Sequence, residues 1–152
     1  MRTIDYLFEH YGESHQNPTN KAIHWICIPL IMFSLFGLLY AIPFPGGRTM
    51  LLNWATILLS FALIFYLKHS VAIFAGFAIF GAFLLWAIHS VAQTSLSLPY
   101  VSLAVFVLAW IGQFVGHKIE GKKPSFFEDL QYLLVGPAWL MHFLYKKAGI
   151  KY

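Results

Sequence analysis

Charged side chains are scarce in this chain of 152 residues. Asp, Glu, Lys and Arg together make up 11% of the residues, whereas soluble domains carry about 25%. Hydrophobic residues make up 59% of the chain and aromatic residues 18%. This composition excludes a disordered chain and an ordinary soluble enzyme. It predicts a small integral membrane protein in which residues 1–152 form a single membrane-embedded domain.

Cysteine is almost absent, and several familiar metal motifs are missing. The single cysteine, Cys27, lies in an apolar stretch, so an internal disulfide is excluded. The sequence has no H-E-x-x-H, no C-x-x-C and none of the histidine boxes of membrane di-iron hydroxylases and desaturases. Residues 1–14 are charged and have no apolar core, so we expect no cleavable signal peptide.

Long apolar stretches fill most of the chain. They cover residues 22–42, 50–67, 70–92 and 99–116, and no charged residue lies between His69 and His117. A helix of about 20 residues spans the hydrocarbon core, which is about 30 Å thick. The expected fold class is therefore all-α, an integral membrane helical bundle with about four transmembrane helices.

Both ends of the chain predict shorter helices. Residues 3–11 place apolar side chains on one helical face, which favours an N-terminal interfacial helix. Asn20 is expected to cap the first span, and residues 125–128 have the spacing of a capping box. Residues 130–145 are apolar but interrupted by Gly136 and Pro137, which predicts a broken C-terminal helix pair.

The basic residues predict the orientation in the membrane. Four spans put both termini on one side, and nine of the ten Lys and Arg residues lie there, with Arg48 alone on the other. The positive-inside rule makes this side cytoplasmic, in the inner membrane of a bacterium or the endoplasmic reticulum of a eukaryote. The basic residues form no patch with interleaved aromatics, so we expect no nucleic acid partner.

Histidines fall at the predicted cytoplasmic ends of the spans. Asn20 and His24 are four residues apart, as are Gln113 and His117, so each pair shares a helical face. Polar groups at the end of a span point into the bundle or toward water. The two helix ends therefore predict a pocket, and the turn after His15 is placed to fold that ring over it.

Imidazole binds zinc, iron, copper and nickel, so this pocket is a candidate metal site. The competing interpretation is a set of ordinary interfacial histidines. In a metal site, Asn17, Asn20 and Gln113 are expected to fix the ring tautomers. His89 falls at the opposite end of its span, and we expect a Tyr or Ser partner for it.

Aromatic residues near the membrane surface have two interpretations. The tryptophans among them, Trp25, Trp110 and Trp139, are expected to anchor the bundle at the interface rather than to contact a substrate. Tyr11 and Tyr132 are candidate hydrogen-bond donors to a bound substrate or O₂.

Two strings carry a resemblance to a known family. They run from His15 to His24 in the pattern H-x-N-P-x-N-x-x-x-H, and from Gln113 to His117 in the pattern Q-F-x-G-H. With this span layout, the chain resembles small membrane proteins whose fungal member is an iron(II)-dependent 2-hydroxy fatty acid dioxygenase. The resemblance implies fatty acid α-oxidation, in which a 2-hydroxy fatty acid and O₂ give CO₂ and a fatty acid one carbon shorter, without 2-oxoglutarate. In fungi this reaction serves the breakdown of a sphingolipid long-chain base.

The resemblance also implies roles for individual residues. His15, His24 and His117 would be ligands of Fe(2+). His142 would be a fourth ligand, at a position where many relatives carry a glutamate. Glu120 would help to orient the ligands.

The chemistry of a 2-hydroxy acid is compatible with such a site. Its carboxylate and hydroxyl oxygens chelate Fe(II), and histidine ligands leave positions open for the substrate and O₂. Lys118 and Lys122 would offset the substrate carboxylate, although a positive-inside flank is the alternative interpretation. The acyl tail would lie in the lipid bilayer region, between spans lined by Phe, Leu and Trp. The functional alternatives are a non-enzymatic small membrane carrier or assembly protein, and a zinc hydrolase.

Overall fold

The computed structural model describes residues 3–122, 130 and 132–152. The regular elements in these ranges are all helices, which confirms the all-α fold class. They are α1 (Thr3–Gly12), α2 (Pro18–Ala41), α3 (Trp54–His69), α4 (Val71–Ala92), α5 (Leu98–Glu120) and α7 (Val135–Ala148). The predicted capping box at residues 125–128 lies outside the described residues.

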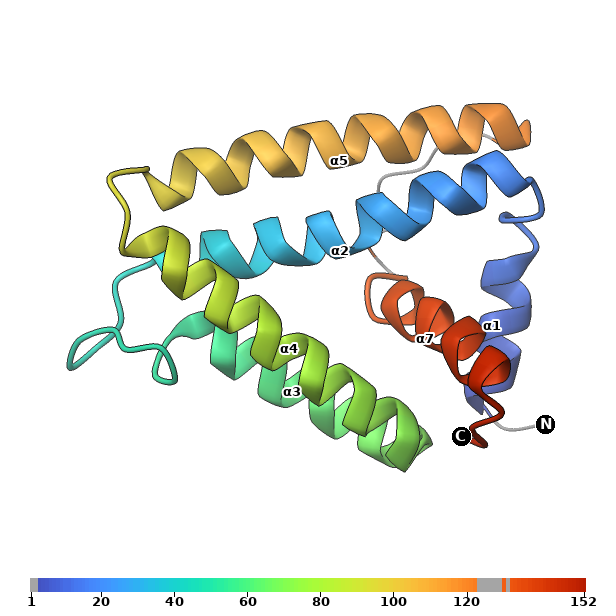
Figure 1. Cartoon of the computed structure of the whole chain (residues 1–152), viewed down its shortest axis with the longest axis horizontal. Coiled ribbons are helices and arrows are strands. Elements are labelled where there is room, and N and C mark those ends of the chain that lie inside the picture. The colour runs from blue at the N-terminus through green and yellow to red at the C-terminus, as the bar shows by residue number, and fades with distance from the viewer. Residues whose placement is uncertain (1–2, 123–129, 131) are drawn as a thin grey trace.

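The helices form two antiparallel pairs and a cap. α2 packs along α5, and the hairpin of α3 and α4 meets the C-terminal end of α2 and runs obliquely away from this pair (Figure 1). α1 and α7 contact each other close to both chain termini. The connections 42–53 and 93–97 lie at the opposite end (Figure 1). The molecule therefore has one end that gathers both termini and another end made of turns.

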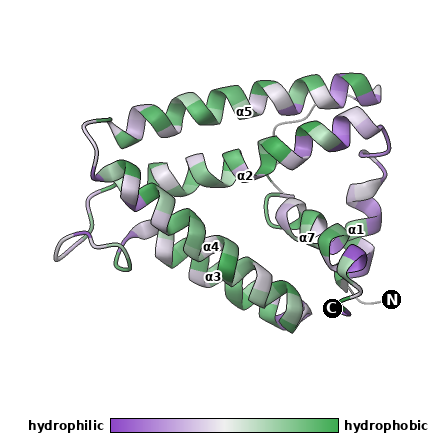
Figure 2. Cartoon of the chain, viewed as in Figure 1, coloured by the Kyte–Doolittle hydropathy of each residue, from purple (hydrophilic) through white to green (hydrophobic). Residues whose placement is uncertain are grey.

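Three helices are long and apolar enough to cross a membrane: α2, α4 and α5, with 24, 22 and 23 residues. The span predicted at residues 50–67 is shorter than expected, since α3 has 16 residues and a length of about 24 Å. It begins late because the Asn53 side chain accepts the Thr56 N–H at 2.9 Å and thereby caps the helix. Figure 2 shows apolar residues along all four of these helices, with hydrophilic residues around α1 and the start of α2.

The first long helix begins earlier than its apolar stretch. Asn17, rather than Asn20, is the N-cap of α2, and its Oδ1 accepts the N–H groups of Thr19 and Asn20 at 2.8 and 3.4 Å. Pro18 follows in the first helical position, where its missing N–H costs nothing. The expectation for Asn20 was therefore wrong, and its side chain is available for contacts with α5.

Close packing of α2 on α5 depends on two glycines in the sequence G-x-x-x-G. A Cβ at Gly112 would collide with the Cys27 thiol, and a Cβ at Gly116 would collide with the Asn20 amide oxygen. Small residues with this spacing let two membrane helices approach closely. The contact brings the polar ends of α2 and α5 together.

The C-terminal helix is not broken at Gly136 and Pro137. α7 runs without interruption from Val135, and both residues lie in its first turn. Proline is tolerated there because an N–H group in the first turn has no partner within the helix. The predicted break was wrong in position, because the helix begins just before the proline.

Two tyrosine hydroxyls attach α7 to the α3–α4 hairpin. Tyr66 of α3 donates to the Leu134 carbonyl at 2.6 Å, just before α7 begins. Tyr145 of α7 donates to the Ala72 carbonyl of α4 at 2.6 Å. These bonds hold α7 across the end of the bundle that contains the termini.

Candidate metal centre

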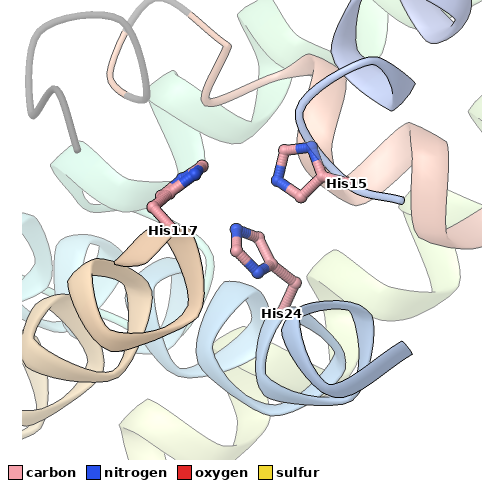
Figure 3. A group of neighbouring side chains, drawn as sticks. All are labelled: His15, His24 and His117. Atoms are coloured by element: carbon pink, nitrogen blue, oxygen red, sulfur yellow. The ribbon is translucent and has the colours of Figure 1, made fainter. Parts of the chain in front are cut away.

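Three histidines that are far apart in the sequence meet at this end of the molecule. His15 precedes α2, His24 lies in the second turn of α2, and His117 lies in the last turn of α5. All three are buried, and each offers a ring nitrogen within 4.8 Å of the other two. Figure 3 shows the three rings facing a common space. We refer to them as the histidine triad.

The rings of the triad are close and strongly inclined to one another. Ring centroids are 4.3 Å apart for His15 and His24, 5.1 Å for His24 and His117, and 5.3 Å for His15 and His117. Two nitrogens bound at about 2.1 Å to one ion are about 3–4 Å apart, depending on the bond angle. Ring movements of about 1 Å would bring the triad to that spacing. The arrangement therefore fits a single metal ion.

Backbone carbonyls fix the tautomers of two rings. His15 Nδ1 donates to the Tyr11 carbonyl at 2.6 Å, and His24 Nδ1 donates to the Asn20 carbonyl at 2.9 Å. Since a carbonyl only accepts, each neutral ring carries its proton on Nδ1 and its basic lone pair on Nε2. Metal-ligating histidines are oriented in this way. Asn20 thus acts on His24 through its backbone and not through its amide.

Glu120, at the end of α5, holds the loop that carries His15. Its carboxylate accepts the Gln16 N–H at 2.7 Å and the Asn17 N–H at 3.0 and 2.8 Å. It also accepts the Asn20 side-chain N–H at 3.0 Å. Glu120 therefore stabilises the backbone conformation of the loop that carries His15 and of the first turn of α2.

Gln113, one of the three amides expected to fix the ring tautomers, has a different environment from Asn17 and Asn20. It is one turn before His117, only 3% exposed, and lines a cavity of about 30 Å³. Asn17 acts as the helix cap already described, and its N–H is held by Glu120. The structure thus places Asn17, Asn20 and Glu120 in the scaffold of the site and Gln113 beside a cavity.

Two aromatic residues surround His15. The Tyr11 ring stacks on it with centroids 4.2 Å apart, and the Trp139 ring lies 5.3 Å away. Trp139 and Trp110 are buried, so the expectation that they are interfacial anchors was wrong for both. The i, i+4 spacing of Tyr11 and His15 is visible in the sequence. No local pattern indicates Trp139, because it comes from α7.

The structure does not bring His142 to the triad. Its Nδ1 is hydrogen-bonded to the Tyr152 hydroxyl, and its ring packs against Phe8 of α1 and Phe143. Burial, with a smaller effect of Lys146, lowers the pKa of the His142 imidazole. The face of α7 that carries His142 is turned toward α1 and the C-terminus, so a four-histidine site is not formed.

Other histidines have separate partners. His89, at the opposite end of the bundle, shares a 2.7 Å hydrogen bond with the Tyr40 hydroxyl, which confirms the expected tyrosine partner. His10 of α1 lies 3.0 Å from the Tyr132 hydroxyl. Tyr132, one of the two candidate donors, is thus hydrogen-bonded to a histidine outside the triad.

The two predicted carboxylate-binding lysines lie around the end of α5. Lys118 and Lys122 are both exposed. Lys122 follows the helix, and its backbone N–H donates to the His117 carbonyl at 3.0 Å. Their positive charges are thus near the triad in the chain but on the outer surface of the site.

Comparisons with known proteins show the family of this chain. Residues 1–148 match the family described as "2-hydroxy-palmitic acid dioxygenase Mpo1-like". The chain is 30% identical over 139 residues to the protein named 2-hydroxy-palmitic acid dioxygenase MPO1 of Saccharomyces cerevisiae, covering 90% of this chain and 76% of that protein. No solved structure matches the chain.

Proposed function

Because this chain belongs to the 2-hydroxy-palmitic acid dioxygenase Mpo1-like family, we propose that it is a non-haem Fe(II) dioxygenase of fatty acid α-oxidation. Its substrates are a 2-hydroxy fatty acid and O₂. Its products are CO₂ and a fatty acid one carbon shorter. The observation that carries the proposal is the convergence of His15, His24 and His117, with ring nitrogens within 4.8 Å of one another.

The reaction balances without a further reductant. A 2-hydroxy acid, R–CH(OH)–COOH, and one O₂ give R–COOH, CO₂ and H₂O. The bond between the carboxyl carbon and C2 breaks, C2 is oxidised to a carboxyl group, and the four electrons released reduce O₂ completely. The substrate therefore takes the place of a co-substrate such as 2-oxoglutarate.

An iron ion held by His15, His24 and His117 would supply the Lewis-acid and redox chemistry that the reaction of a 2-hydroxy acid with O₂ requires. The chain provides the ligands and their orientation. The Tyr11 and Asn20 carbonyls hold two rings with Nε2 toward the common space. Glu120 fixes the loop that carries His15. The burial of the triad keeps bulk water from the reacting oxygens.

The predicted orientation places this site at the cytoplasmic face. The triad lies at the end of the bundle that holds both termini, and nine of the ten Lys and Arg residues belong to that side in the four-span topology. Lys118 and Lys122 lie there and would attract a carboxylate toward the site. The substrate itself partitions into the lipid bilayer.

Metal analysis and turnover test this proposal together. Protein purified without oxygen should contain one iron per chain and should consume 2-hydroxypalmitate and O₂ in equal amounts, with release of CO₂. His24→Ala and His117→Ala should lose bound iron and turnover but keep the helical content and thermal unfolding of the parent. His69→Ala is a matched control, because its ring is hydrogen-bonded to Phe65 of its own helix.

Two outcomes would reject the proposal. Neutral histidines also suit zinc, so stoichiometric zinc without O₂ consumption would point to a hydrolase. A folded, metal-free protein with no effect of His24→Ala would point to a carrier or assembly protein.

A further inference from the structure

An apolar cavity of about 120 Å³ lies between α2, α4 and α7. Ile28, Phe80 and Met141 are among its lining residues, one from each helix. Two of its other lining residues, Leu144 of α7 and Trp25 of α2, are 54% and 37% exposed, so the cavity opens onto an apolar surface. From this surface, an apolar chain would enter the cavity. We refer to it as the outer cavity.

A second, smaller cavity of about 30 Å³ lies beside the outer cavity, and we refer to it as the inner cavity. Ile28 and Pro137 line both cavities, so these two side chains form the wall between them. Ile28 is one turn after His24 on α2, and Gln113 is one turn before His117 on α5. Tyr11, whose ring stacks on His15, also lines the inner cavity, so this cavity is bounded by direct neighbours of the triad.

Gln113 is a polar side chain in this largely apolar space. Its side chain is only 3% exposed and lines the inner cavity. A polar group in such a space interacts favourably with a ligand that can hydrogen-bond to it. An amide offers both a donor and an acceptor, which suit the hydroxyl and carboxylate of a 2-hydroxy acid.

We propose that the two cavities form the substrate path, with the acyl chain in the outer cavity and the 2-hydroxy acid end at Gln113 and the triad. The substrate reaches the site sideways from the lipid, between α2 and α7, and the Ile28 side chain moves aside to let it pass. The inference rests on the proposed function. An acyl chain is the occupant that fits, because the outer cavity is apolar and is separated only by Ile28 and Pro137 from the inner cavity, which Gln113 lines.

Photolabelling tests where the chain binds, independently of turnover. The probe is 2-hydroxypalmitate with a diazirine in the middle of its chain, added to the full-length protein in lipid nanodiscs. We expect labels on peptides that contain Phe80, Met141 and Leu144, and we expect unlabelled 2-hydroxypalmitate to compete them away. Labels that spread over the outward face of α4, or that resist competition, would overturn the proposal.

A chain-length comparison tests the same path through activity. Met141→Trp fills the outer cavity and should lower kcat/KM for 2-hydroxypalmitate by about tenfold or more. The same variant should leave turnover of 2-hydroxyhexanoate, which is too short to occupy that cavity, within about twofold of the parent. Ile79→Trp is the matched control, because Ile79 is 74% exposed on α4 and lines neither cavity. An equal loss of kcat/KM for both acids in Met141→Trp, or no loss for either acid, would overturn the proposed substrate path.

The two measurements separate this inference from the proposed function. If the parent turns over neither acid, the dioxygenase proposal fails, while photolabelling still decides whether the outer cavity binds an acyl chain. If the parent protein turns over 2-hydroxypalmitate normally but the labels lie outside the outer cavity, the proposed substrate path is wrong and the proposed dioxygenase activity is unaffected. Thermal unfolding of Met141→Trp excludes a folding defect as the cause of either result.

Discussion

Both carboxylate oxygens of Glu120 accept the backbone N–H of Asn17, at 3.0 and 2.8 Å. The two residues are 103 positions apart, and their contact joins the last turn of α5 to the N-cap of α2. His15 lies two residues before Asn17. Its position among the buried rings therefore depends on a carboxylate that does not belong to the histidine triad.

Glu120→Gln should weaken metal binding without unfolding the protein. The amide has one oxygen in place of two, and its NH₂ group faces backbone N–H donors, so the loop at residues 14–17 loses part of its anchor. Loss of a group that orients ligands typically lowers metal affinity by about 10–100-fold. A competitive chelator titration measures this change, and hydrogen exchange should rise in the loop. Glu13→Gln, at an exposed carboxylate, is the control; equal affinities for both variants would refute the role of Glu120.

Gly116→Ala should separate α2 from α5 at the site. The added methyl group meets the Asn20 amide oxygen and comes close to His24. Overpacking of this kind costs about 1–3 kcal/mol of unfolding free energy. We expect a lower Tm in detergent and weaker metal binding. Val115→Ala, on the exposed neighbouring position, should change neither quantity, and an unaffected Tm in Gly116→Ala would contradict the close packing.

His142→Ala should retain the full metal content of the parent. Its ring contacts Phe8 and the Tyr152 hydroxyl and is not part of the triad. We expect faster proteolysis near the C-terminus, because the ring holds Tyr152 against α1. Metal analysis of both variants measures the difference, because His24→Ala is expected to lose its bound iron. Loss of iron in His142→Ala, with its fold intact, would restore the four-histidine site implied by the family resemblance.

Tyr40→Phe should affect the opposite end of the bundle only. The variant loses the 2.7 Å hydrogen bond to His89, which is worth about 1 kcal/mol of unfolding free energy. Metal content and turnover should not change, because the turn end of the bundle lies far from the triad along α2. A drop in metal affinity would show that the two ends are coupled, contrary to the structure.

Periodicity in the sequence was sufficient to predict the long helices and part of the site. The apolar stretches located α2, α4 and α5, and the four-residue spacing of Asn20 with His24 and of Gln113 with His117 indicated two of the three rings. The turn at Asn17 and Pro18 correctly placed His15 over them. These features are local, and local patterns can be read without knowing the tertiary structure.

Contacts between distant segments could not be predicted in this way. The partners of Glu120 are at least 100 residues away in the sequence. Trp139 reaches His15 from a helix whose position depends on hydroxyl groups of α3 and α7. The expected ligand role of His142 came from a resemblance. The face of α7 on which this residue lies is determined by packing. The G-x-x-x-G of α5 was visible in the sequence but was not used.

The triad draws on the beginning and the end of the chain, which has a consequence for biosynthesis. His15 and His24 are synthesised first, but they lack their third partner until α3, α4 and α5 have been inserted and α5 has packed against α2. A metal ion bound by all three rings would therefore not be held with full affinity by a partly translated chain. Its acquisition would then be a late step of biosynthesis, open only to molecules in which α5 has packed against α2.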